Sequence, residues 1–507
     1  MNKALFPLAQ LYDHEANHAD RIYLRQPING VWHEFTWRQV MDQARRMAAF
    51  LQSLGLKKGD RVAILSKSCA HWFMADFAIM LAGFVSVPLY YNQNTKDIGY
   101  ILQHADAKAI FVGKLDNWAE QEKAIPFHIE RIAFPYENPM PAKYQWSNII
   151  AETAPLQTNH MPKPDDIFTI FYTSGTTGTP KGAFYTYGKS DSAMTLWNED
   201  TAKWNLPIKR NLFCYLPLAH CFERIAIEFW SLYFDTNVSF PESIKLFPVN
   251  LREVSPTIFC AVPRIWQVFQ SGILNKVSQS KLNIVLNIPI LSGLIKKKIK
   301  HELGLGNAFV CVSGAAPLPS TLLLWYKKLG ITIIEGYGQT ENFIYATINS
   351  LYQQKPGSVG IARDKVELKI GENEELLIRS PSLMDGYYLD PKQTAETIDA
   401  EGFLHSGDKA EIDDDGFVFI TGRLKDQFKT AKGEFIVPTP IELAFAHNPD
   451  IEQCCLIGSD LKQPVLVANL SAAAKLKTKE FVNANISATL FSVNQSLPHY
   501  QRVSKVY

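Results

Sequence analysis

Apolar and polar positions alternate along the first four hundred residues in a way that separates short strands from longer helices. Short apolar runs bounded by turn residues predict buried strands at residues 60–66, 85–90, 107–113, 256–263, 307–314 and 330–338. The longer apolar run at 69–84 predicts a buried helix between the first two strands. This order is typical of a doubly wound α/β fold, and its recurrence predicts a second parallel sheet.

The pattern changes from about Val366 onward. Short alternating runs with turn signals, at 365–380 and 410–423, predict a small antiparallel sheet or a β-barrel. The residues after Arg423 form a short mixed segment. We therefore expect an α/β protein whose main body contains two doubly wound sheets and a small barrel.

Composition excludes several classes of protein. The chain has 507 residues, of which 47% are hydrophobic and 20% charged, as in a globular protein with a large core. Its 51 basic and 50 acidic residues produce no overall field that would attract nucleic acid, so we expect no nucleic-acid partner. The longest apolar runs, 77–91 and 282–295, are shorter than the ~20 residues that span a bilayer.

Cysteine usage and the first residues favour a reducing compartment. The seven cysteines are an odd number and lack metal-ligand spacing. The N-terminal stretch has no cleavable apolar core. We predict a cytoplasmic location.

The stretch FYTSGTTGTPKGAFY, residues 171–185, concentrates hydroxyl-bearing side chains and glycines directly after a predicted strand. Backbone N–H groups and hydroxyls held at a strand end can converge on phosphate oxygens. The spacing is not that of a Walker A loop, because Gly182 follows Lys181 instead of preceding it. The alternative interpretation is a flexible, solvated loop.

The ordered run from Thr173 to Gly182 resembles the phosphate loop of the adenylate-forming superfamily, which includes acyl-CoA synthetases, luciferases and peptide-synthetase adenylation domains. The resemblance implies catalytic roles for Thr173 and Lys181, with Thr173 also a Mg²⁺ ligand. The phosphate-binding residues that it implies are Ser174, Gly175, Thr176, Thr177 and Gly178.

Four further segments resemble motifs of this superfamily in the same order. In EGYGQTEN, residues 335–342, the resemblance places Tyr337 against adenine, Thr340 near the phosphate and Glu341 on Mg²⁺. In GFLHSGD it makes Asp408 the acceptor for ribose hydroxyls. The other cofactor-binding residues that the resemblance implies, from these motifs and from VSGAAPLP and ITGRLKD, are Gly314, Ala315, Ala316, Glu335, Gly336, Gly338 and Arg423.

Each of these residues also has a purely structural interpretation when taken alone. Asp408 and Arg423 would form a surface ion pair, Tyr337 would belong to the core, and Glu341 would be a solvated carboxylate at a helix start. The joint order and spacing of the motifs favour the functional interpretation.

The segment YLPLAHCFERIAIE, residues 215–228, is similar to the long-chain fatty acyl-CoA synthetase branch, and so are residues 256–269 and 428–442. That branch implies two steps: a fatty carboxylate attacks the α-phosphate of ATP, and the thiol of coenzyme A then displaces AMP. ATP, Mg²⁺ and coenzyme A are the implied cofactors. His220 is predicted to be a catalytic residue whose ring lines the acyl-binding or phosphate-binding side of the site. The alternative is a core histidine that packs beside Cys221.

The C-terminal segment raises a separate expectation. The resemblance implies a large N-terminal domain, residues 1–424, a hinge at Lys425, and a small mobile α+β C-terminal lid domain, residues 425–507. It also implies that Lys432 and Gly433, in the segment TAKGEF, line the pantetheine channel. A lysine that contacts the α-phosphate is expected after a strand entered at 497–507, and Lys505 lies too early in the motif to be its equivalent. These features predict impaired adenylation and spared thioester formation. The alternatives are a non-catalytic acyl- or nucleotide-binding relic and an adenylating enzyme for another carboxylate.

The stretch 281–304 combines an apolar half with the lysines Lys296, Lys297, Lys298 and Lys300. The interpretation that we favour is a core helix whose solvated cationic end complements its own dipole. The alternative is a helix in peripheral contact with anionic lipid at the inner face of the membrane.

Overall fold

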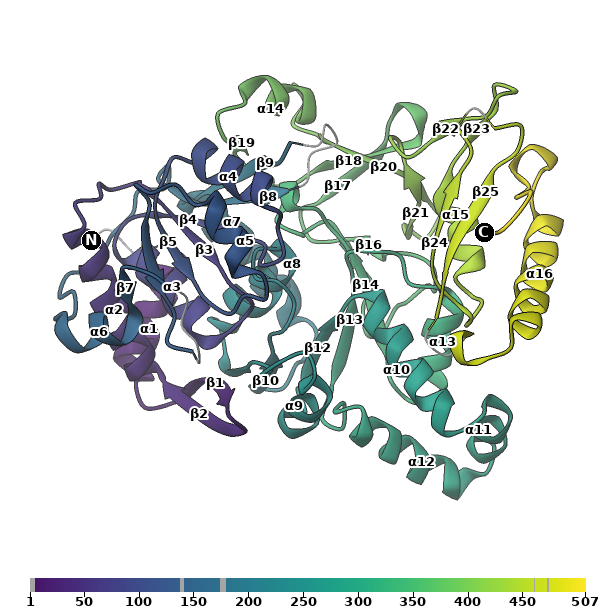
Figure 1. Ribbon diagram of the computed structural model, residues 1–507, viewed down its shortest axis with the longest axis horizontal. Coiled ribbons are helices and arrows are strands. Elements are labelled where there is room, and N and C mark those ends of the chain that lie inside the picture. Colours follow the sequence, from purple (N-terminus) through teal and green to yellow (C-terminus); the bar gives the residue numbers. More distant parts are fainter. Residues whose placement is uncertain (1–4, 137–140, 174–178, 460, 472–473) are drawn as a thin grey trace.

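The computed structural model describes residues 5–136, 141–173, 179–459, 461–471 and 474–507. A large body carries several sheets, and a smaller C-terminal part lies beside its second half (Figure 1). The largest sheet has eight strands. In spatial order they are β19 (Gly386–Tyr387), β9 (Lys181–Thr186), β8 (Ile167–Thr173), β4 (Val85–Leu89), β3 (Arg61–Leu65), β5 (Ala107–Val112), β6 (Glu130–Ala133) and β7 (Tyr144–Gln145).

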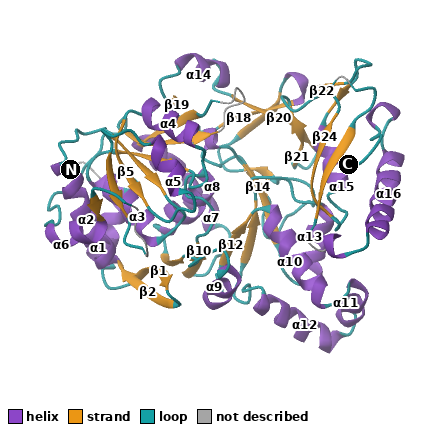
Figure 2. Ribbon diagram, in the orientation of Figure 1, coloured by secondary structure: helices purple, strands orange, loops and turns teal. Residues whose placement is uncertain are grey.

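The strands β8, β4, β3, β5, β6 and β7 run parallel to one another. At one edge β9 pairs antiparallel with β8, and β19 pairs antiparallel with β9. Alternate residues of β3 face opposite sides, as the period of two requires. Val62 and Ile64 belong to the same buried cluster as α2 (Trp37–Ser53) and α3 (Ala70–Leu81), whereas Ala63 and Leu65 belong to the cluster that contains α4 (Thr95–His104). The predicted doubly wound arrangement is confirmed here, and Figure 2 shows the helices around the strands.

The helix predicted at residues 69–84 is found as α3 (Ala70–Leu81), and the apolar pattern does not predict the other helices of this half. All twelve residues of α3 are buried, which explains why its sequence is apolar on every side. The helices are α1 (Leu8–Asn17), α2 (Trp37–Ser53), α3 (Ala70–Leu81), α4 (Thr95–His104), α5 (Trp118–Gln121), α6 (Trp146–Glu152) and α7 (Tyr187–Ala202).

The second half of the body contains a five-stranded sheet. Its strands are β12 (Ile258–Ala261), β13 (Val310–Ser313), β14 (Ile333–Tyr337), β15 (Thr347–Ile348) and β16 (Ile361–Ala362). The three predicted strands are parallel, and β15 and β16 extend them in the antiparallel sense, so the second sheet is mixed. Its helices are α9 (Phe247–Val254), α10 (Pro263–Lys276), α11 (Gln279–Leu286), α12 (Pro289–Glu302) and α13 (Ser320–Lys328).

A further four-stranded sheet, which the sequence pattern does not predict, joins distant segments. Its order is β10 (Lys209–Phe213), β11 (Asp235–Ser239), β1 (Ile22–Ile28) and β2 (Val31–Thr36). Between β10 and β11 lie the short α8 (Cys221–Glu223) and a π-helical turn, Arg224–Phe229.

The segment after Val366 forms an open antiparallel sheet in the order β17 (Glu367–Ile370), β18 (Glu375–Arg379), β20 (Leu404–Ile412) and β21 (Val418–Arg423). Strands β17 and β21 lie at its two edges. The sheet is therefore open, and the expected β-barrel is not found. Helix α14 (Pro391–Thr397) lies between β19 and β20 in the chain.

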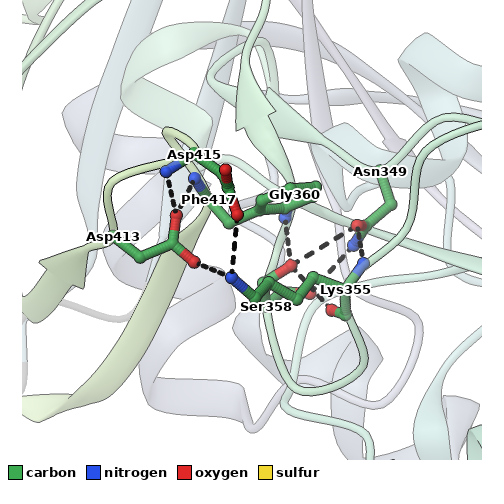
Figure 3. Close-up of polar contacts among 7 residues, drawn as sticks. All are labelled: Asn349, Lys355, Ser358, Gly360, Asp413, Asp415 and Phe417. Atoms are coloured by element: carbon green, nitrogen blue, oxygen red, sulfur yellow. Dashed lines mark hydrogen bonds and ion pairs between the residues drawn. The ribbon is translucent and has the colours of Figure 1, made fainter.

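A polar network fixes this sheet against the five-stranded one (Figure 3). The side chain of Asn349 accepts from the Lys355 N–H (3.2 Å) and donates to the Ser358 carbonyl (2.9 Å). The Lys355 ammonium pairs with Asp413, whose carboxylate also accepts from the Phe417 N–H (2.8 Å). The turn before β21 is therefore tied to the segment after β15.

The C-terminal part has a core of its own, formed by residues between Phe428 and Val506. Its elements are β22 (Phe428–Lys429), β23 (Phe435–Ile436), α15 (Pro438–Phe445), β24 (Ile451–Ile457), β25 (Val465–Leu470) and α16 (Lys479–Ser496). Residues 505–507 hydrogen-bond with β25, in agreement with the strand expected there. The Thr321 hydroxyl lies 2.8 Å from Nδ1 of His447, which links this part to α13.

The basic stretch 281–304 forms two helices, α11 and α12, separated at Asn287 and Ile288. Only Leu282 in α11 and Ser292 in α12 are buried, so the expected core helix is wrong: both helices lie on the surface. Among the described residues, none of the helices has the length and apolar content needed to cross a bilayer.

Candidate nucleotide and acyl site

The β8–β9 hairpin presents the first predicted site residues. Thr173, the last residue of β8, pairs with Lys181, the first residue of β9. The register therefore places both at the mouth of the loop that connects the strands. The predicted phosphate-loop residues Ser174, Gly175, Thr176, Thr177 and Gly178 lie outside the described residues.

The Lys181 ammonium is directed toward β19 and α14. Its Nζ donates to Oε1 of Gln393 (2.6 Å) and lies 5.4 Å from the centre of the Tyr387 ring. Burial and then the neighbouring charge of Lys425 lower the pKa of Lys181. A cation that is partly desolvated in this way interacts strongly with an anionic ligand.

Glu341 lies in a 3₁₀ turn, Thr340–Asn342, directly after β14. Its Oε1 accepts a hydrogen bond from the Tyr387 hydroxyl (2.7 Å). Because Lys181 packs on the ring of the same tyrosine, the structure brings Lys181 and Glu341 to one place. Thr340 is close by, with its hydroxyl 3.2 Å from Sγ of Cys221.

Asp408 and Arg423 face each other across β20 and β21, with Arg423 Nε 2.9 Å from Asp408 Oδ1. Oδ2 of Asp408 accepts from the Tyr337 hydroxyl (2.7 Å) and from Nε2 of Gln339 (2.8 Å). The Asp408 side chain is 4% exposed and that of Arg423 is 62% exposed. This is more than a surface ion pair, because the carboxylate is buried and shared with the EGYGQTEN motif.

A cavity of about 50 Å³ lies beside these residues. From the predicted set it is lined by Gly314, Ala315, Gly336, Tyr337, Gly338 and His220. Gly338 has a steric role, because a Cβ there would lie 2.5 Å from the backbone of Ile344. Ala316 is exposed and is not among the lining residues.

His220 precedes α8, and its Nδ1 accepts a hydrogen bond from the Phe222 N–H (3.1 Å). The neutral ring therefore carries its proton on Nε2. Burial lowers the pKa of His220, which favours this neutral form. The ring can donate a hydrogen bond into the cavity and is unsuited to act as a general base through Nδ1.

Sequence reasoning missed the opposite wall of the cavity, formed by Trp197 and Arg363. The Arg363 guanidinium carbon lies 4.0 Å from the ring centres of both Trp197 and Tyr345, and its Nε donates to Oδ2 of Asp200 (2.7 Å). No local signal marks this group, since its members come from α7 and from two separate segments after β14.

Glu335 does not join the cavity. Its Oε1 accepts from the Leu318 N–H (3.2 Å), and the residue lines a different hollow together with Lys327 and Gln354. Gly336 and Tyr337, the next two residues of β14, line the cavity, whereas the Glu335 carboxylate is held by the Leu318 N–H. Its predicted role in cofactor binding is therefore not supported by its position.

Glu335 carries a pH-dependent contribution to stability. Burial raises its pKa from 4.5 to about 7. Between these values the unfolded chain has released the proton and the folded chain retains it, so stability falls as the pH rises, by about 3 kcal/mol in total. Glu335→Gln should remove this slope. Urea unfolding near pH 5 and near pH 8 measures it, and an unchanged slope in the variant would contradict the assignment.

Lys432 and Gly433 lie in the turn between β22 and β23 and are exposed. Gly433 has φ of 86°, a left-handed conformation, and its N–H donates to the Thr430 carbonyl (2.8 Å). Neither residue lines the cavity. Their predicted contact with coenzyme A stays a prediction.

The predicted donors for Mg²⁺ are the Glu341 carboxylate and the Thr173 hydroxyl. In the described part of the chain, no group of three or more His, Cys, Asp or Glu side chains is arranged to hold a metal ion. Mg²⁺ in nucleotide sites is held through one or two carboxylates together with substrate phosphates and water. The residues present therefore fit an ion that binds with ATP.

Comparisons with known proteins agree with this arrangement. Residues 11–388 match the family model "AMP-binding enzyme", and residues 425–507 match "AMP-binding enzyme C-terminal domain". A long-chain-fatty-acid–CoA ligase of Mycobacterium bovis, FadD15, is 29% identical over 490 residues, which cover 89% of this chain and 79% of that protein. Human long-chain-fatty-acid–CoA ligase 6 is 28% identical, over 84% of this chain and 68% of its own length.

Solved structures share the fold. The anthranilate CoA ligase AuaEII, in complex with anthranoyl-AMP, superposes with a TM-score of 0.81 at 21% identity, over 99% of this chain and 93% of that one. The adenylation domain of a Mycobacterium chelonae carboxylate reductase superposes with a TM-score of 0.82 at 21% identity, over 98% of this chain and 85% of that one. The family model covers most of the chain and spans the hairpin, the EGYGQTEN turn and β19, so this protein belongs to the AMP-binding enzyme family.

Proposed function

We propose that this protein activates a long-chain fatty acid with Mg·ATP and transfers the acyl group to coenzyme A. The observation that carries the proposal is the meeting of Lys181 and Glu341 at Tyr387, beside the Tyr337–Asp408 hydrogen bond. The long-chain class is suggested by relatives that are named long-chain-fatty-acid–CoA ligases.

In the first step the fatty carboxylate oxygen attacks the α-phosphorus of ATP, and the bond to the β-phosphate oxygen breaks. Lys181 supplies positive charge to the phosphates, and Asp408 accepts hydrogen bonds from ribose hydroxyls. Glu341, with Thr173, would hold Mg²⁺, which neutralises phosphate charge when bound. The Nε2–H of His220 donates into the cavity on the acyl side.

In the second step the thiol of coenzyme A attacks the acyl carbon, its proton is lost, and AMP leaves. We assign the C-terminal part, from Lys425 onward, as the lid for this step. Gly433, whose conformation favours a residue without a side chain, would let the pantetheine arm pass, with Lys432 beside it.

A second candidate function is the activation of a shorter carboxylic acid. The observation that favours it is the small volume of the cavity, about 50 Å³, closed on one side by Trp197 and Arg363.

The test is product analysis with purified protein, ATP, Mg²⁺ and coenzyme A. Palmitate, oleate, butyrate and benzoate are supplied separately, and acyl-CoA and AMP are measured by mass spectrometry. We expect palmitoyl-CoA and oleoyl-CoA together with AMP. Product from butyrate or benzoate alone would support the second candidate, and AMP binding without product from any acid would indicate a non-catalytic relic.

We expect Asp408→Asn to weaken AMP binding by about 10-fold to 150-fold, because hydrogen bonds to a charged group contribute about 1.5–3 kcal/mol each. Asp408 is buried against Tyr337 and would contact the ribose, which AMP and ATP share. Isothermal titration calorimetry with AMP measures the effect. Glu411→Gln, an exposed carboxylate on the same strand, is the control. Unchanged AMP affinity in Asp408→Asn would remove this residue from the site.

A further inference from the structure

The α11–α12 hairpin exposes more apolar side chains than a surface helix pair needs. It lies at the outer edge of the body, below α10 and α13 in Figure 1. Ile290 is 81% exposed, and Ile284 and Leu294 are each 63% exposed. The other exposed large apolar residues of this stretch are Val277, Ile288 and Leu291.

Five exposed residues of α12 form one continuous stripe. Ile290, Leu291 and Leu294 are followed by Lys297 and Lys298, and the spacing of three, four and seven residues puts all five on one face. All five are exposed. The stripe is apolar toward the α11 end of the helix and cationic toward the other.

The remaining lysines of α12 lie on the side that faces the body. A Cβ added at Gly330, directly after α13, would lie 3.5 Å from Nζ of Lys300 and 4.0 Å from Cδ of Lys296. Both lysines are half-buried. The apolar stripe on the opposite side is therefore not the face by which α12 is anchored.

The charge of this region is one-sided. Between Lys276 and His301 the sequence has six lysines and no Asp or Glu, although the whole chain has a formal charge of only +1. The indole N–H of Trp325 donates to Oε1 of Gln279 (2.8 Å), which holds α13 against α11. The last turn of α13 adds the exposed Lys327 and Lys328 to the same region.

We propose that the α11–α12 hairpin docks this protein on the surface of an anionic lipid bilayer. The apolar end of the stripe would enter the interface between headgroups and acyl chains, and the lysines would pair with lipid phosphates and carboxylates. A helix of fourteen residues is too short to span a bilayer, but it is long enough to lie in the interface.

Charge complementarity selects the bilayer over a second copy of this chain. Two copies that met through this stripe would bring Lys297 and Lys298 of both close together, and like charges repel. Fatty acids partition into bilayers, so the docked protein would lie next to its proposed substrate. Docking on lipid does not depend on the proposed reaction, because binding to vesicles is measured without ATP or fatty acid.

The test uses the full chain and sedimentation with large unilamellar vesicles. We expect binding to vesicles of phosphatidylcholine mixed with phosphatidylserine, and much weaker binding to phosphatidylcholine alone or at high salt. Lys297→Glu/Lys298→Glu should lower the partition coefficient for anionic vesicles at least about 25-fold, because each lysine lost near the surface lowers it roughly 5-fold. Ile290→Ser/Leu294→Ser should also lower it, because the inserted apolar area is lost.

Matched controls lie in the C-terminal part. Lys475→Glu/Lys479→Glu makes the same change of charge at exposed positions, and Leu476→Ser removes a side chain that is 90% exposed. Both should retain binding. Thermal unfolding checks that every variant is folded. The proposal is overturned if the wild-type chain does not bind the anionic vesicles, or if the control pair loses as much binding as the α12 pair.

Discussion

Glu341→Gln is expected to lower the rate of ATP-dependent adenylation by about 10²–10³, the usual cost of removing one preorganised group that stabilises developing charge. The substitution keeps the shape of the side chain and the hydrogen bond from Tyr387, and it removes the negative charge that Mg·ATP needs. AMP lacks the β- and γ-phosphates, so AMP affinity should change little.

Pyrophosphate release in the presence of fatty acid measures the rate, and calorimetry measures AMP binding. Tyr387→Phe is the companion variant, because it preserves the carboxylate and removes only the hydroxyl that orients it. We expect a smaller loss of rate, partly recovered at high Mg²⁺ concentration. If Glu341→Gln weakened AMP and Mg·ATP binding equally, Glu341 would have a purely structural role.

Arg224→Met is expected to destabilise the folded protein by about 3–5 kcal/mol, the cost of breaking a buried ion pair. The Arg224 side chain is fully buried, and its Nη2 donates to both oxygens of Asp76 (2.8 and 2.6 Å). Its Nε also lies 3.4 Å from Oε2 of Glu228, in the π-helical turn that follows α8. Burial raises the pKa of Glu228 well above its ordinary value, and the nearby Asp76 adds to this shift.

Without Arg224, two carboxyl groups would remain in an apolar environment with no cation between them. Urea unfolding at neutral pH measures the loss. Arg38→Met is the control, since Arg38 pairs with Asp20 at the surface (2.9 Å) and such exposed pairs contribute about 0–1 kcal/mol. The double variant Arg224→Met/Asp76→Asn should recover part of the stability, and equal losses in Arg224→Met and Arg38→Met would contradict the prediction.

Local sequence patterns predicted those parts of the molecule whose structure depends on near neighbours. The apolar runs located β3, β4, β5 and the three parallel strands of the second sheet, because a buried parallel strand needs apolar side chains on both faces. The order of the EGYGQTEN and GFLHSGD motifs predicted Tyr337, Glu341 and Asp408 as site residues, and the structure brings Tyr337 and Asp408 into contact. The boundary between α11 and α12 at Pro289 is not among the predictions, although proline is favoured at the start of a helix.

The faces and contacts of these elements depend on residues that are distant in the chain. The Tyr387–Glu341 hydrogen bond joins positions 46 residues apart and forms because β19 pairs with β9. The Trp197–Arg363 wall likewise joins α7 to the segment after β16.

The sequence by itself determined the positions of six buried strands, the order of the motifs and the resemblance to the family. Only the tertiary structure decided that Glu335 turns away from the cavity, that the sheet of β17, β18, β20 and β21 is open, and that α12 lies on the surface. The physical reason is that periodicity records which residues are apolar or small, whereas burial and side-chain partners depend on how sheets and helices pack together.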